Sequence, residues 1–451
     1  MPRILFITYS HNVWGGIEKW LHDLTFWLQN RQWDLHVGLA KGARFNSPDA
    51  YLAAHGHMRK HAVVIDGSIG TDEARIDAIV RTCRSLAPDI VVPVGIGAVF
   101  PAIERLRSQD GKSPRLVVPV HSTHADYLQN ILEYFPIVDQ VVVISRQLEK
   151  FLEAKLPGEE HRIHYVKNRA AEPVTERVPP GDKLRIAYVG RLDTLQKRVQ
   201  DIVPFCRKLH DAGAAAEIHV YGAGPAEAAL KEQLREYIER GDVVFHGYMS
   251  PEMLYREAYP KTDVLIMFSD AEGSPFVLPE AMHHGIVPVI SRFSGHASEG
   301  LLVPGRNSLT FPVGCPDVAA GLVLDLLNDP DLRAALGRQA LKDVESDIEE
   351  GMFQDWETLL LRAMDEPPRQ ILVSACRPDA PSPPGRLEKL GLSHGMANWL
   401  RGRFGRKFPH GSGFDEWPGS LPASETVLAE ICALLDDIER DAGQRLYSKV
   451  Q

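Results

Sequence analysis

The feature that most constrains the fold of this chain is a repeated alternation between short apolar runs and longer amphipathic stretches. Most of the runs are rich in β-branched side chains, which is typical of strands buried on both faces of a parallel sheet. In the first half of the chain they cover residues 4–9, 35–39, 62–65, 90–94, 116–120 and 141–145. Between the first two, residues 17–30 carry apolar side chains at helical spacing, Trp20 and Leu24 among them. The alternation therefore predicts βαβ units and an α/β fold.

The alternation stops once and then restarts. Residues 170–181 are polar, rich in proline and poor in large aliphatic side chains, as is typical of a linker. The later apolar runs cover residues 184–189, 218–221, 243–245, 264–268, 287–290 and 309–311. The sequence thus predicts two doubly wound domains over 1–175 and 182–350, a helix over 351–365 and a C-terminal extension over 366–451. Ligands of such sheets bind beyond the carboxyl ends of the strands, so two facing sheets would hold a ligand in the cleft between them.

Composition and charge narrow the class of protein. The chain has 451 residues, of which 44% are hydrophobic and 24% charged, as is usual for globular proteins. Its net charge is −10 and no basic domain stands out, which argues against a nucleic-acid partner. The five cysteines lie far apart and none forms a C-x-x-C pair, so neither a disulfide framework nor a zinc knuckle is expected.

The apolar run at the N-terminus is too short for the core of a signal peptide, and polar residues follow it. No later segment approaches the about 18 uninterrupted apolar residues of a membrane span. These features predict a cytoplasmic protein, and they leave room for contact with the inner face of a membrane.

Two basic residues follow the first strand of the second domain. A glycine turn delivers Arg191 and Lys197 just beyond the carboxyl end of that strand. Arginine binds a diphosphate bidentately and lysine adds a point charge, so the loop suits a diphosphate ligand. A solvated loop with ordinary surface charges explains the same residues equally well. After the next strand, Gly222 and Gly224 would let a ligand approach the backbone, although a tight turn is the more common explanation.

The segment over residues 268–282 carries two glutamates around an expected helix start. Pro275 suits the first turn of a helix, and free backbone N–H groups there can hold phosphate or sugar oxygens. Glu272 precedes this helix and Glu280 lies about a turn inside it. Because a carboxylate repels a phosphate, the expected partners are hydroxyl groups, which a nucleotide sugar offers on both its hexose and its ribose. The spacing of two glutamates alone carries no such information.

Two loops of the first domain are further candidates. Gly15 and Gly16 lie between the first strand and the first helix, where backbone N–H groups could face a diphosphate or an acceptor, although a plain βα turn explains them as well. His121 ends another strand at the edge that would open onto the cleft, where a single histidine is more often structural. No metal-binding spacing such as H-E-x-x-H or D-x-D faces this cleft, so no catalytic metal is predicted. A departing diphosphate would then be stabilised by Arg191, Lys197 and backbone amides.

In this order, the segments resemble the retaining nucleotide-sugar transferases of glycosyltransferase family four, which have the GT-B fold. The resemblance spans roughly residues 1–365 and is more specific in the second domain. It implies two Rossmann-like domains facing across a cleft. The residues that carry it are Gly15-Gly16-Ile17-Glu18, Gly190-Arg191 with Lys197, Gly222-Ala223-Gly224-Pro225, and Glu272-Gly273-Ser274-Pro275 followed by Glu280-Ala281-Met282.

The resemblance also implies a role for each matching position. Arg191 and Lys197 would bind the donor diphosphate, and Glu280 would bind the ribose hydroxyls. Glu272 would hold the transferred hexose, and His121 matches the active-site histidine of the family. The other implied donor-binding positions are Gly16, Gly224, Gly247 near the base, Gly273, Ser274, Phe276 and Val277. The family transfers sugars with retention of anomeric configuration and without a metal, and no cofactor is expected.

Two segments depart from the family pattern. Residues 165–169 stand where the family commonly has a Pro-Asn-Gly-Val-Asp-like run, which predicts a different local loop. Residues 292–296 replace a more usual double-glycine turn, which predicts altered contacts with the donor.

The C-terminal extension contains one basic and apolar stretch, over residues 386–408. Its lysines and arginines alternate with leucine, tryptophan and phenylalanine, so the stretch could dock on an anionic membrane, as a lipid-linked acceptor would require. Four glycines interrupt it, and they favour the alternative of a loop packed on the body of the protein.

These observations predict a retaining glycosyltransferase that moves a hexose from a nucleotide-sugar donor to a saccharide or lipid-linked acceptor, in cell-surface polysaccharide or glycolipid biosynthesis. A sugar phosphorylase of the same fold would need a lysine-bound pyridoxal phosphate. A catalytically silent binding protein of the same fold is the alternative from another class, and the presence of Arg191, Lys197, Glu272 and Glu280 argues against it.

Overall fold

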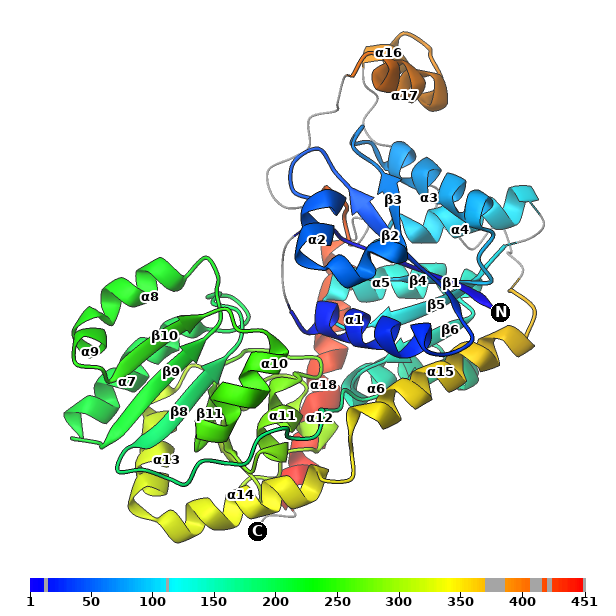
Figure 1. The fold of residues 1–451 in the computed structure, drawn as a ribbon. Helices are drawn as coiled ribbons and strands as arrows, with labels where there is room; N and C mark the ends of the chain where they lie inside the picture. Colours follow the sequence, from blue (N-terminus) through cyan, green and yellow to red (C-terminus); the bar gives the residue numbers. More distant parts are fainter. Residues whose placement is uncertain (12–14, 111–112, 370–385, 406–415, 420–423, 449–451) are drawn as a thin grey trace. The chain divides into compact units, whose positions relative to one another are not determined.

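The computed structural model describes residues 1–451 except 12–14, 111–112, 370–385, 406–415, 420–423 and 449–451. The chain divides into two compact units, each with one parallel sheet flanked by helices (Figure 1). The first unit comprises Met1–Val143, Leu152–Tyr165 and Asp355–Ala433, and the second comprises Ile144–Phe151, Val166–Gln354 and Leu434–Gln451. Each apolar run predicted as a strand forms one, which confirms the α/β class.

The sheet of the first unit has the strand order β3-β2-β1-β4-β5-β6-β7, and all of its pairs are parallel. The central strand β1 is buried on both faces, and its Ile4 pairs with Leu35 on one side and Ile90 on the other. The strands are β1 (Arg3–Thr8), β2 (Asp34–Lys41), β3 (Ala62–Asp66), β4 (Ile90–Pro93), β5 (Arg115–Val120), β6 (Gln140–Val143) and β7 (Ile163–Tyr165).

The helices of the first unit connect these strands. They are α1 (Gly16–Gln29), α2 (Pro48–Ala54), α3 (Asp72–Leu86), α4 (Val99–Asp110), α5 (Ala125–Tyr134) and α6 (Arg146–Lys155), whose first residues belong to the second unit. The predicted helix over 351–365 is confirmed as α15 (Glu349–Asp365). Its Trp356 ring lies 5.0 Å from that of Trp20 on α1, so α15 completes the core of the first unit.

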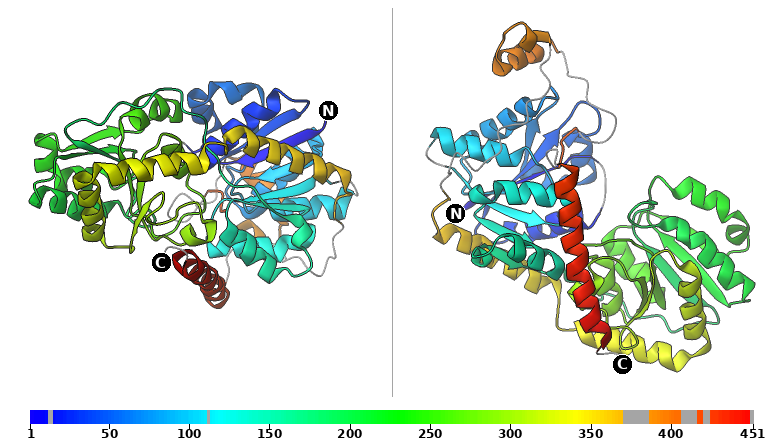
Figure 2. Two further views of the ribbon diagram at one scale, coloured as in Figure 1. Left: turned by 90° about the horizontal axis from the view of Figure 1, so that it is seen from below. Right: turned by 180° about the vertical axis from the view of Figure 1, so that it is seen from behind.

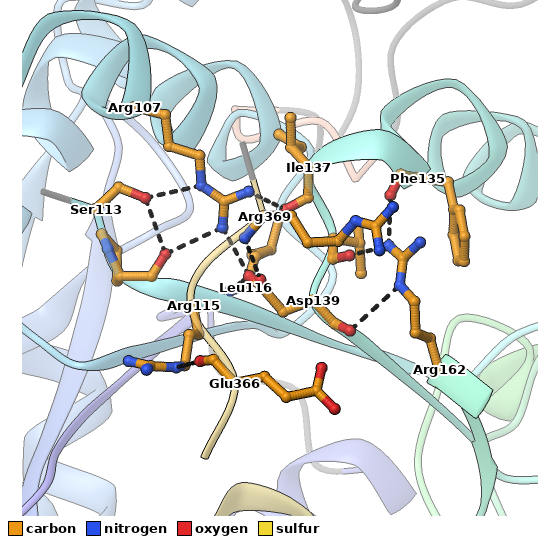
Figure 3. Close-up of polar contacts among 12 residues, drawn as sticks. Arg107, Ser113, Arg115, Leu116, Phe135, Ile137, Asp139, Arg162, Glu366 and Arg369 are labelled. Carbon is orange, nitrogen blue, oxygen red and sulfur yellow. Dashed lines mark hydrogen bonds and ion pairs between the residues drawn. The ribbon is translucent and has the colours of Figure 1, made fainter. Parts of the chain in front are cut away.

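A buried ion network holds the chain where it leaves α15 (Figure 3). The Asp139 carboxylate accepts hydrogen bonds from Arg107 Nη2 at 2.6 Å and from the Arg369 backbone N–H at 2.8 Å. Arg115 Nε donates to the Glu366 carbonyl at 2.8 Å. These bonds lie at the amino ends of β5 and β6, on the opposite edge of the sheet from the carboxyl ends where ligands bind. The network is therefore structural.

The sheet of the second unit has the order β10-β9-β8-β11-β12-β13 and is also parallel. Its strands are β8 (Leu184–Val189), β9 (Ala216–Tyr221), β10 (Val243–Gly247), β11 (Val264–Met267), β12 (Val287–Ser291) and β13 (Leu309–Phe311). Its helices are α7 (Ile202–Asp211), α8 (Glu227–Gln233), α9 (Arg235–Glu239), α10 (Pro251–Met253), α11 (Val277–His283), α12 (His296–Glu299), α13 (Pro316–Asn328) and α14 (Pro330–Val344). Residues 170–181 pack on this unit, where Arg177 Nη1 donates to the Gly285 carbonyl at 2.6 Å.

The C-terminal part contains α16 (Arg386–Lys389), α17 (His394–Arg403) and α18 (Glu425–Ser448), and Figure 2 shows α18 as one uninterrupted helix. Ser424 caps α18, because its Oγ accepts from the Val427 N–H at 3.4 Å. The expectation of a loop over 386–408 is wrong for residues 394–403, where Ser393 caps α17 and outweighs the two glycines within it. Residues 406–408 and Cys376 lie outside the described residues. None of the described helices is long and apolar enough to cross a membrane.

Candidate functional site

The candidate site of the second unit is built from the loops that follow β8, β9, β11 and β12. Because these neighbouring strands are parallel, their carboxyl ends lie at one edge of the sheet and their loops emerge side by side. All the residues predicted in this domain to bind a donor diphosphate, hexose or ribose lie in these loops or in the helix after β11.

Glycines let the loops after β8 and β9 pack backbone against backbone. A Cβ atom at Gly222 would lie 1.8 Å from the Gly190 carbonyl oxygen, and one at Gly224 would lie 2.4 Å from the Leu192 carbonyl oxygen. The backbone N–H of Gly190 donates to the Tyr221 carbonyl at 3.0 Å. The neighbouring loop therefore leaves no room for a side chain at these two glycines, independently of any ligand.

Lys197 and Glu272 form a direct ion pair. Lys197 Nζ lies 2.6 Å from Glu272 Oε1, and only 17% of the lysine side chain and 6% of the glutamate side chain are exposed. The Lys197 backbone is fixed by Asp193, whose Oδ1 accepts its N–H at 3.2 Å. The solvated-loop explanation of Lys197 is thus wrong, because its ammonium is directed at a nearly buried carboxylate from a loop 75 residues away.

Gln196 connects this pair to Arg191. The Gln196 Oε1 atom accepts from Arg191 Nη2 at 2.9 Å, and its Nε2 donates to the Ala271 carbonyl at 3.0 Å. The same Nε2 lies 3.5 Å from Glu272 Oε2. Arg191 itself remains exposed. The structure therefore brings Arg191, Lys197 and Glu272 together. It also adds Gln196, which was not predicted because an amide in a loop has no distinctive sequence pattern.

The loop that carries Glu272 is held by the loop after β12. Glu272 N–H donates to the Ser294 carbonyl at 3.2 Å, and a Cβ atom at Gly295 would lie 2.7 Å from the Glu272 carbonyl oxygen. Gly295 also has a φ of 104°, which favours glycine. The segment 292–296, which departs from the family pattern, thus still supplies a glycine that supports this loop. Asn168 Nδ2 donates to the Ser274 carbonyl at 2.7 Å, which gives the unusual segment 165–169 a role in the same loop.

The helix after β11 begins slightly later than predicted. Helix α11 starts at Val277, with Phe276 as its N-cap residue and no side-chain cap, so Pro275 precedes the helix instead of opening it. Gly273 and Ser274 lie in the loop before it, and their side of the loop is partly exposed. The amides over 273–277 are placed at the sheet edge next to Glu272, and their contact with a hexose stays a prediction.

Glu280 lies in the first turn of α11 and is buried. Its Oε2 accepts a hydrogen bond from Tyr259 Oη at 2.6 Å. Burial, together with the neighbouring Glu280 charge, raises the pKa of Tyr259 well above its ordinary value, so the phenol stays protonated and donates. The contact of Tyr259 with Glu280 was not predicted, because Tyr259 lies 21 residues away in a segment without a motif. The predicted contact of Glu280 with a ribose is not tested by these contacts.

The end of β10 carries the predicted base-binding position, Gly247. Its φ of 69° lies in the left-handed region, which explains glycine at this turn. The preceding His246 stacks on Tyr221, with ring centroids 4.4 Å apart and an interplanar angle of 13°. Tyr248, which follows, is exposed.

Two of the predicted site residues, Gly16 and His121, lie in the first unit. Gly16 is the first residue of α1, and its N-cap Gly15 has no side-chain cap. His121 follows β5, with its ring 4.4 Å from the Trp20 indole. Burial lowers the pKa of His121 to about 3, so the imidazole is neutral at pH 7. In the described part of the chain its buried Nε2 has no hydrogen-bond partner. Trp20 was predicted only as a core residue of the helix.

The described residues contain no cluster of three or more His, Cys, Asp or Glu side chains that could hold a metal ion. At the site, Arg191, Lys197 and backbone amides can bind an anion, whereas Glu272 and Glu280 can accept hydrogen bonds from hydroxyl groups.

Comparisons with known proteins relate the second unit to glycosyltransferases. Residues 183–329 match the family described as Glycosyl transferases group 1. The putative colanic acid biosynthesis glycosyltransferase WcaL of Escherichia coli is 28% identical over 198 residues, which are 41% of this chain and 46% of that protein. The lipopolysaccharide 1,6-galactosyltransferase of Salmonella typhimurium is 30% identical over 149 residues, 32% of this chain and 40% of that protein. The chain thus matches less than half the length of these two relatives.

Solved structures share the fold over most of the chain. The lipopolysaccharide outer core galactosyltransferase WaaB, in its apo form, superposes with a TM-score of 0.60 at 20% identity, covering 80% of this chain and 99% of that one. Anabaena HepE in complex with UDP-glucose gives a TM-score of 0.64 at 16% identity, covering 80% of this chain and 99% of that one. The two parallel α/β sheets thus have the GT-B fold. Residues 183–329, which match the family described as Glycosyl transferases group 1, include Arg191, Lys197, Glu272 and Glu280.

Proposed function

We propose that this protein is a retaining glycosyltransferase that moves a hexose from a nucleotide-sugar donor to a saccharide or lipid-linked acceptor. Its setting would be the biosynthesis of a cell-surface polysaccharide or glycolipid, at the cytoplasmic face of the membrane. The observation that carries the proposal is the pair of Lys197 and Glu272, connected to Arg191 through Gln196 at the carboxyl edge of the second sheet. The relatives named above, which include a galactosyltransferase, support the same class of reaction.

The chemistry of these groups fits a nucleotide sugar. The Lys197 ammonium has three N–H donors, and Glu272 Oε1 takes one of them, so the others can bind a diphosphate oxygen. Arg191 adds an exposed guanidinium that can bind the same diphosphate bidentately. Two cations at this place would stabilise the negative charge that the departing nucleoside diphosphate gains in the transition state.

The carboxylates would bind the two sugars of the donor. Glu272 Oε2 lies 3.5 Å from Gln196 Nε2 and can accept from a hexose hydroxyl. Glu280, which Tyr259 orients, would accept from the ribose. Neutral His121 would offer its Nε2 to a hydroxyl of the transferred hexose. The amides over 273–277 would complete the hexose site, with the base near Gly247.

A donor screen tests this proposal. The protein is mixed with UDP-, GDP-, ADP- and dTDP-sugars, and both the thermal shift and the release of nucleotide are recorded. We expect stabilisation by one donor and a clear loss of that shift in Glu280→Ala, because the ribose loses its acceptor. The matched control is Glu227→Ala, which removes an exposed carboxylate of α8 in the same unit and should leave the shift unchanged.

Two results would overturn the proposal. A folded protein that no donor stabilises would not bind nucleotide sugars at all. A donor that binds without any release of nucleotide, even with added saccharide or glycolipid acceptors, would identify a silent binding protein of the same fold.

Peripheral membrane contact through residues 386–408 belongs to the same proposal, because a lipid-linked acceptor is held at the bilayer surface. Within this stretch the structure describes residues 386–405, and the structural evidence for such contact comes from these residues.

A further inference from the structure

Helix α17 buries two polar side chains against the rest of the first unit and exposes two large apolar ones, while Ala397 is buried and Arg403 is exposed. Asn398 and Arg401 are buried, whereas Met396 is 58% exposed and Trp399 is 66% exposed. A surface helix of a globular protein normally shows the opposite arrangement, with its apolar stripe toward the core. This arrangement indicates that the exposed face of α17 contacts an apolar partner outside the core of the first unit.

Hydrogen bonds and one ion pair orient the buried polar side chains of α17. Asn398 Oδ1 accepts from Thr71 Oγ1, the N-cap residue of α3, at 3.3 Å, and from Arg401 Nη1 at 2.7 Å. Arg401 Nη2 also pairs with Glu388 Oε2 at 2.5 Å, which ties α16 to α17. These bonds fix which way the helix faces, so the exposure of its apolar side chains follows from specific contacts with α3 and α16.

Two further exposed apolar side chains lie just after α16 and just after α17, which Figure 1 draws next to each other as a hairpin. Leu390, between the helices, is 76% exposed, and Phe404, just after α17, is 72% exposed. With Met396 and Trp399 they make four large exposed apolar side chains over residues 390–404. Exposed apolar side chains that occur singly need no explanation, but a group of this size marks an interaction surface.

The charge of the hairpin selects the kind of partner. Over residues 386–405 the chain carries Arg386, Lys389, Arg401 and Arg403 against Glu388 alone, a net charge of +3, although the whole chain is at −10. Arg401 and Glu388 neutralise each other, so Arg386, Lys389 and Arg403 supply the excess, and all three are exposed. A basic rim around tryptophan, phenylalanine and leucine is the composition that binds the interface of an anionic bilayer.

We propose that the α16–α17 hairpin is the surface by which this protein docks on an anionic lipid bilayer. Met396, Trp399 and Phe404 would enter the interface between headgroups and acyl chains, where an indole ring is favoured. Arg386, Lys389 and Arg403 would meet the anionic headgroups. A lipid-linked acceptor in the proposed function requires a surface of the protein that contacts the membrane, and the hairpin would be that surface. Vesicle binding does not depend on sugar transfer, so a failure of the docking proposal and a failure of the proposed function can be told apart.

Vesicle co-sedimentation of the full chain tests this inference. We expect binding to vesicles of phosphatidylcholine mixed with phosphatidylglycerol, little binding to phosphatidylcholine alone, and weaker binding as salt is added. The double variant Trp399→Ser and Phe404→Ser should lose binding. Lys389→Gln should bind about fivefold more weakly, since each basic residue near the surface contributes about 1 kcal/mol. The matched control is Val318→Ser, which removes an exposed apolar side chain of α13.

Unfolding curves and the donor-induced thermal shift check that the variants are folded, because their side chains are exposed and lie outside the donor site. Equal binding by the double variant and the unmodified protein would overturn the inference, as would equal binding to neutral and anionic vesicles. The inference would also be overturned if the unmodified protein does not bind vesicles but is a dimer, and the double variant is a monomer. That result would assign the hairpin to self-association.

Discussion

At the scale of single residues, the site depends on charges that are paired before any ligand arrives. Lys197 keeps an ordinary hydrogen-bond distance of 2.6 Å to Glu272, so its ammonium is already oriented and needs no rearrangement to meet a diphosphate. His121 contributes differently, because burial keeps it neutral and leaves its Nε2 without a partner in the described part of the chain. A neutral imidazole can exchange a hydrogen bond with a hydroxyl group and adds no positive charge.

Lys197→Ala should slow transfer far more than it weakens donor binding. The variant removes a cation where charge develops on the leaving group, and the loss of one such group typically lowers kcat by about 100-fold to 1000-fold. The measurement is the initial rate of nucleotide release at saturating donor. Lys231→Ala, which removes an exposed lysine that pairs with Glu227 on α8, is the matched control and should retain the full rate. Near-normal turnover in Lys197→Ala would remove this residue from the catalytic site.

At the scale of elements, the sequence predicted the strands well because buried parallel strands leave a local signal, a short run of β-branched residues. It also predicted that Arg191, Lys197 and Glu272 would meet, since the carboxyl ends of neighbouring parallel strands share one edge. The start of α11 was placed too early, because Pro275 fits a helix entry and the turn before it equally well. The contacts of Tyr259, Asn168 and Gln196 could not be predicted, because each is a tertiary contact of a common residue type.

Gly222→Ala should destabilise the second unit. The new Cβ atom would lie 1.8 Å from the Gly190 carbonyl oxygen, so one of the two loops must move, and we expect a loss of about 3 kcal/mol in the free energy of unfolding. Chemical denaturation provides the measurement. Gly321→Ala is the matched control, because this glycine lies in α13 with open space around it, and alanine there should be neutral or stabilising by up to about 1 kcal/mol. Equal stability of the two variants would show that the loops adapt freely.

At the scale of the whole molecule, the described C-terminal residues are integral to both units. In the second unit, Glu439 of α18 accepts from the backbone N–H groups of Ala297 and Ser298, at 2.7 and 3.1 Å. In the first unit, Glu416 is buried and accepts from four consecutive backbone N–H groups, those of residues 43–46. The sequence offered no sign of either bond, because a single glutamate more than 100 residues from its partners leaves no local pattern.

The segment around Glu416 lies at the carboxyl ends of the first-unit strands. Trp417, also buried, donates from its indole to the carbonyl of Lys41, the last residue of β2, at 3.2 Å. The Pro418 carbonyl accepts the Gly97 N–H, beyond the end of β4, at 3.0 Å. Glu416 therefore organises a loop at the edge where an α/β sheet binds its ligands, and its effect on stability should depend on pH.

Glu416→Gln isolates the charge of this anchor. The four N–H donors hold the pKa of the Glu416 carboxyl below its ordinary value of 4.5, even though burial alone would raise it. The unfolded chain therefore takes up this proton at a higher pH than the folded protein does. The stability that Glu416 contributes is thus present above the ordinary pKa and is lost as the pH falls through the lower folded value.

We accordingly expect Glu416→Gln to be less stable than the unmodified protein by about 1–3 kcal/mol at pH 7, because an amide supplies one weaker acceptor in place of two charged oxygens. The difference should shrink steadily as denaturation is repeated at pH values that fall below the ordinary pKa of 4.5 and through the lower folded value. Glu430→Gln, on the exposed face of α18, controls for the loss of one negative charge. A difference that stays constant with pH would mean that shape rather than charge holds the loop over residues 43–46, and no difference at any pH would show that the buried carboxylate does not anchor it.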